Sequence, residues 1–305
     1  YSLLLILWFV LLLLSCCNNP FGQSLFQLHQ SSISGLDFKN RLTESSDFNI
    51  LNYLYYYNGG GVSIGDINND GLEDIYMISN LETNKLFLNK GNLKFEDITE
   101  KAGVGGQYDW STGTTMVDIN ADGFLDIYVC NLGNYEGMMG KNELFINNKN
   151  GTFSEAASDY GLDFRSFSTQ TCFFDYDSDG DLDMYLLNHA IHTINAYAPR
   201  ERLNKISDSV SGDKLLRNNM DQGIMNFTDV TSEAGIQSNP IGFGLGVAAS
   251  DVNNDGWPDL YVSNDFHEND YFYINNGDGT FTDKHAKLIS HTSKYSMGND
   301  INDVN

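Results

Sequence analysis

The sequence predicts an all-β fold, a β-propeller built from four-stranded antiparallel blades. The first observation is a nine-residue pattern, Asp-x-(Asp/Asn)-x-Asp-Gly-x-x-Asp, which occurs in full four times. The copies begin at Asp66, Asp118, Asp175 and Asp251, and a further copy opens at Asp303, so the starts are 52, 57, 76 and 52 residues apart. The second observation is that every copy lies between short apolar runs bounded by turn residues, which is typical of strands. A repeat of about 50 residues with four such strands is one blade of a propeller.

Composition and charge narrow the range of partners. The chain has 305 residues, of which 41% are hydrophobic and 13% aromatic, enough to bury a substantial core. Seventeen Lys and Arg residues oppose 41 Asp and Glu residues, which gives a net charge of −24. A surface this acidic repels phosphate backbones, so nucleic acid is not expected as a partner. The same balance disfavours a polybasic membrane surface and indicates cation binding instead.

The first residues resemble an export signal. Residues 2–14 are almost entirely apolar. This length suits the core of a secretory signal but is short for a membrane-spanning helix, which needs about 20 residues. The run Leu13-Leu14-Ser15-Cys16 resembles a bacterial lipobox, which would make Cys16 the lipid-modified first residue of the mature protein. We expect an exported lipoprotein, held at the periplasmic face or the cell surface by this lipid alone. An uncleaved anchor or an ordinary signal peptide is the alternative.

We divide the chain into three parts. Residues 1–17 form the signal peptide, which we read as truncated because the chain begins with Tyr1. Residues 18–57 form an N-terminal segment, and residues 58–305 form about four blades and the start of a fifth. Residues 26–36 loosely match the end of a repeat, so we expect this segment to supply an outer strand to the last blade and close the ring. Because that blade would follow Asn305, we expect a propeller that is N-terminally complete and C-terminally truncated.

Within each blade the four strands are expected in a fixed order. A run rich in small and β-branched residues precedes the Asp pattern and gives the first strand, as at residues 61–65. An apolar-Tyr-apolar run follows the pattern and gives the second strand, as at Ile75-Tyr76-Met77. The third strand ends in Asn and the fourth begins with Phe, and these marker residues are Asn89, Asn147, Asn218 and Asn275, and Phe95, Phe153, Phe227 and Phe281.

The Asp pattern forms a cage of oxygen ligands. Side chains at positions 1, 3, 5 and 9 converge with the carbonyl of position 7, and glycine at position 6 permits the sharp turn. Such hard ligands suit Ca²⁺, which accepts about six to eight oxygens in loose geometry. We expect about one structural Ca²⁺ per complete loop. The candidate ligands are Asp66, Asn68, Asp70, Leu72 and Asp74; Asp118, Asn120, Asp122, Phe124 and Asp126; Asp175, Asp177, Asp179, Asp181 and Asp183; Asp251, Asn253, Asp255, Trp257 and Asp259; and, in the opening copy, Asp303 and Asn305.

Two other interpretations of the pattern compete. An EF-hand needs a bidentate Glu at position 12 and flanking helices. Here position 12 is apolar in every complete copy and the flanks are strand-like, which excludes the EF-hand; these residues are Met77, Val129, Leu186 and Val262. In the second interpretation the loops are only Asp-rich and Asn-rich turns without a cation. Four copies in register favour the cation.

The repeat resembles the FG-GAP/VCBS repeats of integrin-α-type propellers. Three further motifs are similar to bacterial lipoproteins related to cartilage acidic protein, which often carry an ASPIC/UnbV module: Asn58-Gly59-Gly60-Gly61, Asn-x-Leu-Phe-x-Asn at 84–89 and 142–147, and Phe-x-Asp-x-Thr-x-x-Ala-Gly at 95–103 and 227–235. The resemblance covers roughly residues 26–305. It implies that the calcium loops join the first two strands of each blade on one face and that the ions are structural. Pro258 in the fourth loop and the long spacing before that loop depart from the pattern.

We expect recognition on the opposite face, where the connections between the second and third strands vary in length. The longest is an insertion at residues 189–213. The candidate ligand-face residues are Tyr135, His189, His192, Tyr197, Arg200, Asp265 and His267. His189 and His192 are spaced as metal ligands but lack a third partner, and a His-Tyr-Arg group could serve a lyase or hydrolase. Packing across the propeller mouth is the alternative for each residue.

Two smaller features complete the prediction. The aromatic run from Tyr53 to Tyr57 could form a sugar-stacking platform, but its place just ahead of a strand favours packing. Cys130 and Cys172 lack the spacing of a zinc or redox site and are expected as buried free thiols, with a disulfide between them left open.

The leading functional hypothesis is a non-enzymatic binding or adhesion module for a protein or glycan at the cell surface. The alternative is a propeller enzyme, a polysaccharide lyase or hydrolase, with its site on the insertion at 189–213.

Overall fold

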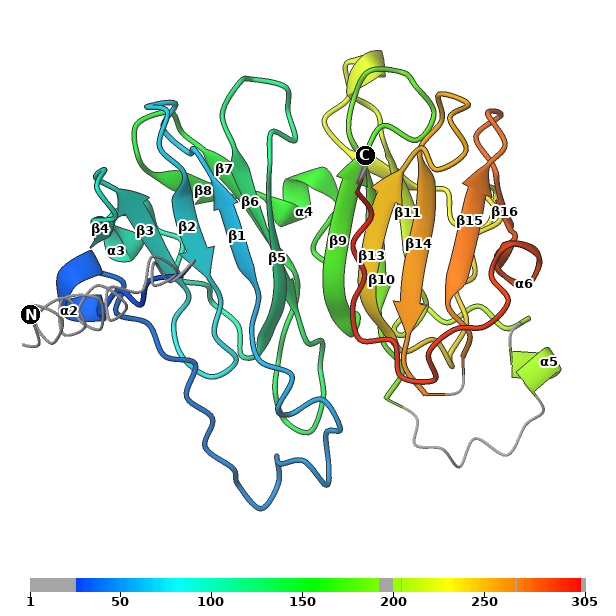
Figure 1. Ribbon diagram of the computed structural model, residues 1–305, viewed down its shortest axis with the longest axis horizontal. Helices are drawn as coiled ribbons and strands as arrows, with labels where there is room; N and C mark the ends of the chain where they lie inside the picture. Colours follow the sequence, from blue (N-terminus) through cyan, green and yellow to red (C-terminus); the bar gives the residue numbers. More distant parts are fainter. Residues whose placement is uncertain (1–25, 192–199, 204, 267, 303–305) are drawn as a thin grey trace, which may run out of the picture.

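The computed structural model describes residues 26–191, 200–203, 205–266 and 268–302 (Figure 1). The described chain forms four sheets, each with four antiparallel strands that follow one another in sequence order. We call the sheets blades 1 to 4. Their strands are β1 (Val62–Gly65), β2 (Asp74–Met77), β3 (Lys85–Asn89) and β4 (Phe95–Asp97); β5 (Ser111–Val117), β6 (Asp126–Asn131), β7 (Glu143–Asn147) and β8 (Phe153–Glu155); β9 (Ser168–Phe174), β10 (Asp183–Asn188), β11 (Lys214–Asn218) and β12 (Phe227–Asp229); and β13 (Gly244–Ser250), β14 (Asp259–Asn264), β15 (Tyr271–Asn275) and β16 (Phe281–Asp283).

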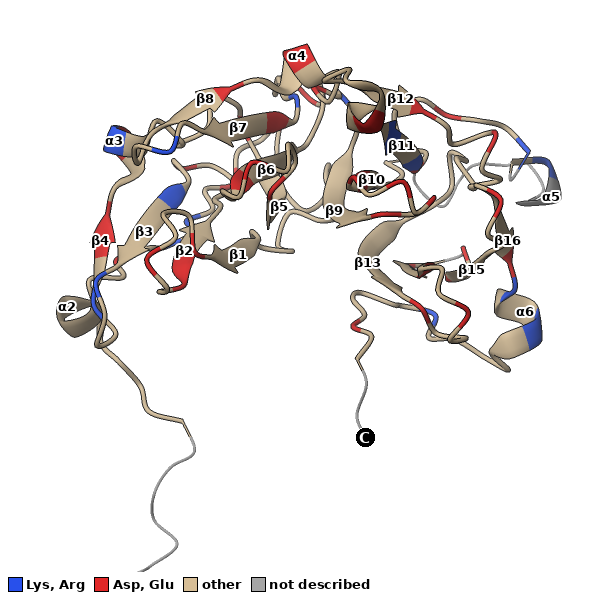
Figure 2. Ribbon diagram, turned by 90° about the horizontal axis from the view of Figure 1, so that it is seen from above, with Lys and Arg blue, Asp and Glu red and all other residues tan. Residues whose placement is uncertain are grey.

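The blades lie side by side along an open arc, as seen in Figure 2. The first strand of each blade lines the inside of the arc and the fourth lies outside. The all-β prediction of four-stranded propeller blades is therefore confirmed. The Asn and Phe marker residues predicted from the sequence do end the third strands and begin the fourth strands. The four described blades do not close into a ring.

The core lies between neighbouring blades. One apolar cluster joins blades 1 and 2, the next joins blades 2 and 3, and another joins blades 3 and 4. The tyrosine of the second strand is fully buried in the first three blades, at Tyr76, Tyr128 and Tyr185. Tyr261 in blade 4 is only half-buried, because no described blade packs on that side. Each blade thus needs a neighbour to bury its apolar faces.

The N-terminal segment packs on the outer edge of blade 1. Its helix α2 (Ser31–Ser34) ends at Gly35, which has a φ of 83° and lies against the carbonyl of Phe95 at the start of β4. The turns that follow the fourth strands lie against the next blade in the same way, as Gly235 lies against Phe281. Residues 26–36 hold this helix but no described strand, so the ring-closing strand remains a prediction.

Short helices follow three of the outer strands, and two more lie in the insertion and in the turn between β11 and β12. They are α3 (Thr99–Ala102), α4 (Ala157–Tyr160), α5 (Arg200–Leu203), the 3₁₀ helix η1 (Met220–Gln222) and α6 (His285–Leu288). Of the described helices, none has both the length and the apolar character needed to cross a membrane. The leader and Cys16 lie outside the described residues.

The last described residues run along the inside of blade 4. The side-chain amide of Asn299 donates to the carbonyl of Gly246 at 3.0 Å and to Ser263 Oγ at 2.9 Å. This is where the first strand of a fifth blade would lie. Asp303 and Asn305, the predicted start of a fifth loop, fall outside the described residues.

Candidate metal loops and the opposite face

Each Asp loop joins the first two strands of a blade on one face of the arc, the face that Figure 2 views. The position-1 carboxylate organises the loop by accepting backbone N–H groups from positions 5 and 6. Asp118 accepts from Asp122 N at 2.9 Å and from Gly123 N at 2.8 Å. Loops 1, 3 and 4 repeat both bonds through Asp66, Asp175 and Asp251. Four separate sequences therefore adopt one loop geometry.

The position-9 carboxylate clamps the base of each loop. Asp126 is fully buried, and its two oxygens accept from Ile119 N at 3.2 Å and Asn147 N at 2.7 Å. Burial raises the pKa of Asp126 to about 7 and that of Asp183 to about 8, and nearby loop carboxylates add to the shift. A buried carboxylate beside other carboxylates favours a bound cation, because a positive charge offsets both burial and repulsion.

Loop 3 comes closest to a preformed cation site. Asp175, Asp177 and Asp183 each offer an oxygen atom, and these atoms lie within 4.8 Å of one another. Asp177 Oδ1 is buried and has no hydrogen-bond partner, which is costly unless something else pairs with it. The donor set is all oxygen, as a hard divalent cation requires. These acidic residues are therefore placed to bind a metal ion.

A second acidic group in loop 3 includes a residue that the sequence reasoning missed. Asp179 and Asp181 lie within 4.8 Å of Asp221, which η1 contributes after β11. The Asp181 side chain accepts from Asp221 N at 2.9 Å. Asp181 had been predicted as a ligand through its backbone carbonyl, and no sequence signal connects it to a residue 40 positions away. Elsewhere among the described residues no group of three His, Cys, Asp or Glu side chains comes as close together, and loops 1, 2 and 4 differ from loop 3 in having Asn at position 3.

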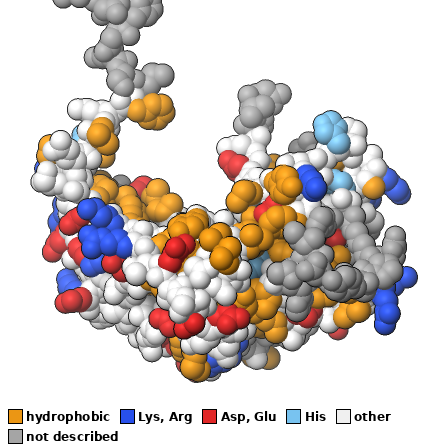
Figure 3. Space-filling model, turned by 90° about the horizontal axis from the view of Figure 1, so that it is seen from below, with side chains coloured by type: hydrophobic (Ala, Val, Ile, Leu, Met, Phe, Trp, Pro, Cys, Tyr) orange, Lys and Arg blue, Asp and Glu red, His pale blue; other side chains and the backbone are white. Residues whose placement is uncertain are grey.

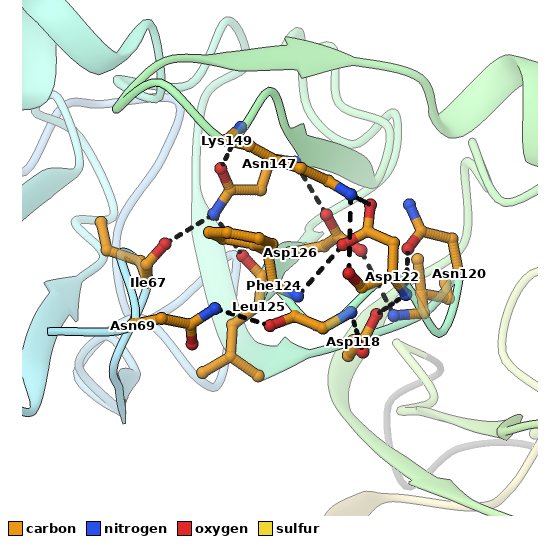
Figure 4. A network of polar contacts seen from close by, with 12 residues as sticks. Ile67, Asn69, Asp118, Asn120, Asp122, Phe124, Leu125, Asp126, Asn147 and Lys149 are labelled. Carbon is orange, nitrogen blue, oxygen red and sulfur yellow. Dashed lines mark hydrogen bonds and ion pairs between the residues drawn. The ribbon is translucent and has the colours of Figure 1, made fainter. Parts of the chain in front are cut away.

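Neighbouring loops are hydrogen-bonded to each other, as Figure 4 shows for blades 1 and 2. The Asn147 side-chain amide donates to the carbonyl of Ile67 at 2.8 Å, and that of Asn69 donates to the carbonyl of Gly123 at 2.8 Å. Blades 3 and 4 repeat the first contact between Asn275 and the carbonyl of Tyr176, also at 2.8 Å. The loops thus form part of the junctions between blades.

On the opposite face, the same kind of hydrogen bond closes each connection between the second and third strands. A backbone N–H at the end of the second strand donates to an Asn or Asp just before the third. The pairs are Ser79 to Asn84 at 2.9 Å, and Asn131 to Asn142, Asn188 to Asp213 and Asn264 to Asp270, each at 2.8 Å. The long insertion starts and ends at one of these pairs.

The structure corrects the role expected for His189. His189 is 1% exposed, so it cannot act as a solvent-facing base or metal ligand. Its Nδ1 lies 3.0 Å from the carbonyl of Ala190, which only an N–H can satisfy, so Nε2 accepts from Tyr53 OH at 3.0 Å. Burial lowers the pKa of His189 to about 4, which keeps the ring neutral.

The other described candidates on this face also pack against the N-terminal aromatic run. Asp265 is buried and accepts from Tyr55 OH at 3.3 Å, and Tyr135 OH donates to the carbonyl of Asn52 at 2.6 Å. Figure 3 shows this face, with hydrophobic side chains gathered across its hollow. His192, Tyr197 and His267 lie outside the described residues, and Arg200 lies in α5, where its side chain is not described.

The packing interpretation of the aromatic run is confirmed for three of its tyrosines. Tyr53, Tyr55 and Tyr56 are buried in a cluster with Trp110, whereas Tyr57 is 60% exposed. Beside this cluster lies a cavity of about 190 Å³ whose walls include Tyr53, Tyr55 and Trp110. Cys130 and Cys172 are free thiols, and Cys130 is fully buried.

Comparisons with known proteins agree with this geometry. Residues 66–129, 132–186 and 251–305 match the model of the FG-GAP-like repeat, which is more than half of the chain. The chain is 28% identical over 219 residues to cartilage acidic protein 1 of Xenopus tropicalis and 29% identical over 216 residues to that of Mus musculus. Each match covers 68% of this chain but 29% of the relative, so the chain spans less than a third of the length of these relatives.

A solved structure of an Agrocybe aegerita lectin that recognises non-reducing terminal N-acetylglucosamine covers 72% of this chain, and the match spans 50% of the lectin chain. The sequence identity is 20% and the TM-score is 0.40, too low to carry an argument. The family match and the four repeated Asp loops agree on one assignment. The chain belongs to the FG-GAP-like repeat family.

Proposed function

We propose that this chain is a calcium-binding propeller of an exported protein and that it serves as a binding module for a protein or glycan at the cell surface. The observation that carries the calcium proposal is loop 3, where three carboxylate oxygens converge and one buried oxygen lacks a partner. The other loops share its hydrogen-bonded geometry. Ca²⁺ suits these loops better than Mg²⁺, because Mg²⁺ demands near-ideal octahedral geometry and keeps several waters.

The proposed ions are structural. Position-9 carboxylates link each loop to its third strand, and side-chain amides link loops of neighbouring blades, so an ion in a loop would brace both. Extracellular calcium modules typically bind with a Kd of about 10⁻⁴ to 10⁻³ M, and we expect that range. An exported, calcium-rich setting would keep such loops filled.

The calcium proposal is tested by thermal unfolding of the mature chain in millimolar calcium, in magnesium and in chelator, with bound calcium counted. We expect a higher midpoint in calcium alone and about four bound ions, because a ligand that binds only the folded state stabilises it. A cooperative transition whose midpoint does not change with calcium would show that the Asp loops are turns without a bound cation.

The binding role is supported by the opposite face, where connections of different length extend from a repeated scaffold. The enzyme alternative cannot use His189 as its base, because His189 is buried and neutral, whereas His192 and Tyr197 lie outside the described residues. Incubation with a panel of polysaccharides separates the two functions. Retention of a glycan without release of shorter products supports a binding module, whereas product release that is lost in His189→Ala or Tyr197→Ala, with the fold intact, supports the enzyme.

A further inference from the structure

Lys149 places an ammonium group against loop 2. The residue lies in the turn between β7 and β8, and its Nζ is 3.4 Å from Asp122 Oδ2 and 3.5 Å from the Asp122 carbonyl. The same Nζ lies 5.3 Å from the centre of the Phe124 ring, a cation–π contact. Asp122 holds position 5 of the loop, so the ammonium lies beside a carboxylate that would hold a cation, and the ring that it contacts belongs to the residue at position 7 (Figure 4).

The backbone at Lys149 is one that lysine rarely adopts. Its φ is 62°, in the left-handed region that glycine tolerates and other residues do not favour. Blades 1 and 4 have glycine at the equivalent turn position, Gly91 and Gly277. The equivalence is fixed by a shared hydrogen bond, in which this residue's N–H donates to the side chain of the Asn that ends the third strand.

A comparison of loop 1 with loop 2 separates the effect of Lys149 from that of the ligand residues. Its side-chain ligand set is the same as that of loop 2, with Asp at positions 1, 5 and 9 and Asn at position 3. Its turn carries Gly91 in place of Lys149, and the neighbouring Lys90 pairs with Glu96 at 3.7 Å rather than with the loop. Loops 1 and 2 therefore have the same side-chain ligands, and an ammonium group contacts the position-5 carboxylate in loop 2.

We propose that Lys149 is a tethered cation that competes with calcium for loop 2 and makes this loop bind calcium more weakly than loop 1. Without calcium, the ammonium partly neutralises Asp122 and holds loop 2 to the β7–β8 turn of the same blade. With calcium, it repels the bound ion or must swing away. This inference rests on the proposed calcium function.

The test compares Lys149→Met with Lys90→Met, which removes an ammonium from the corresponding turn of blade 1. Calcium is titrated while the backbone amides of Gly123 in loop 2 and Gly71 in loop 1 are followed by NMR. Unfolding is measured in chelator and in saturating calcium. Lys149→Met should raise the calcium affinity of loop 2 about tenfold, the effect in water of removing a unit charge about 6 Å from a divalent ion, and leave loop 1 unchanged. Lys90→Met should leave both affinities unchanged.

The stability readout separates competition from simple packing. Lys149→Met should lower the midpoint in chelator and raise it in saturating calcium relative to the wild type. If Lys149→Met lowered the midpoint equally in both buffers, or left the calcium titration of Gly123 unchanged, the inference would be overturned. A normal calcium titration of Gly71 would still support the calcium function in that case. If no loop amide responds to calcium, the inference about Lys149 and the proposed calcium function are both wrong. Lys149→Gly removes the ammonium and gives the turn its blade 1 residue, so it provides a second variant that should fold.

Discussion

Asn147 joins the Asp loops of two blades. Its side-chain amide donates to the carbonyl of Ile67 at 2.8 Å, in loop 1, while its backbone N–H donates to Asp126, which closes loop 2. Ile67 and Asn147 both lie in the interior, so neither bond is readily replaced by water. One asparagine thus connects two candidate cation sites to the packing of blade 1 on blade 2.

The first prediction concerns this asparagine. Asn147→Ala should lower the free energy of unfolding by about 1–3 kcal/mol, because it leaves the buried carbonyls of Ile67 and Leu125 without their donor. Chemical denaturation measures the change. Asn148→Ala, an exposed position next in the chain, should change stability by less than about 0.5 kcal/mol. Equal losses in the two variants would show that the contact between blades contributes nothing.

The second prediction concerns the extra carboxylate of loop 3. Asp177 stands at position 3, where the other complete loops have Asn. Asp177→Asn should weaken calcium binding at loop 3 and raise the midpoint in chelator, because the Asp175 and Asp179 carboxylates then repel one group fewer. The reciprocal variant Asn120→Asp should strengthen calcium binding at loop 2. Calcium titration with the amides of Gly180 and Gly123 as reporters checks both, and unchanged affinities would remove position 3 from the ligand set.

The third prediction concerns pH. Burial raises the pKa of Asp213 to about 7, and its carboxylate accepts from Asn188 N and Tyr185 OH. The unfolded chain ionises Asp213 near pH 4, and the folded chain does so only near pH 7. The unfolded state therefore binds fewer protons over this range, and Asp213 makes stability fall as pH rises from about 4 to 7.

Asp213→Asn removes that dependence. Asparagine holds the same place in blades 1 and 2, as Asn84 and Asn142, where its side-chain oxygen accepts the same backbone bond. Above pH 7 the variant should be more stable than the wild type by at most about 4 kcal/mol, the value of a pKa shift of about three units, and the two should converge near pH 4. Denaturation curves at several pH values measure this. A constant difference at all pH values would contradict the assignment to Asp213.

The fourth prediction concerns the lipid anchor. With the leader intact in a bacterial host, labelled fatty acid should be incorporated into the wild-type protein and lost in Cys16→Ser. Cys17→Ser provides the matched control and should still be labelled, because the lipobox places the modified cysteine at position 16. Labelling that follows Cys17, or none in the wild type, would contradict the proposed anchor.

The repeated features of this protein could be predicted from the sequence, because a strand hairpin is specified by nearby residues. Asn89 and Phe95 marked the end of one strand and the start of the next, and the structure places both there. The Asp loops could be recognised for the same reason.

Features that depend on contacts between distant parts of the chain could not be predicted. Nothing in the sequence near His189 shows that Tyr53, 136 residues away, packs against it and donates to its Nε2. Asp221 and Lys149 each follow the third strand of a blade, and they lie near the Asp loop only because that strand runs back toward the loop. The periodicity of the sequence predicts the strands of each blade. The contacts that differ from blade to blade can be identified only from the structure.

The repeated hydrogen bond that closes the connections on the opposite face has a practical consequence for protein engineering. The same bond spans the short step from Ser79 to Asn84 and the long excursion from Asn188 to Asp213. The sheet therefore meets every connection through the same pair of atoms, whatever its length. We therefore expect the connection after Asn188 to tolerate changes in length, provided that Asn188 keeps its bonds to Asp213 and to the carbonyl of Gly212.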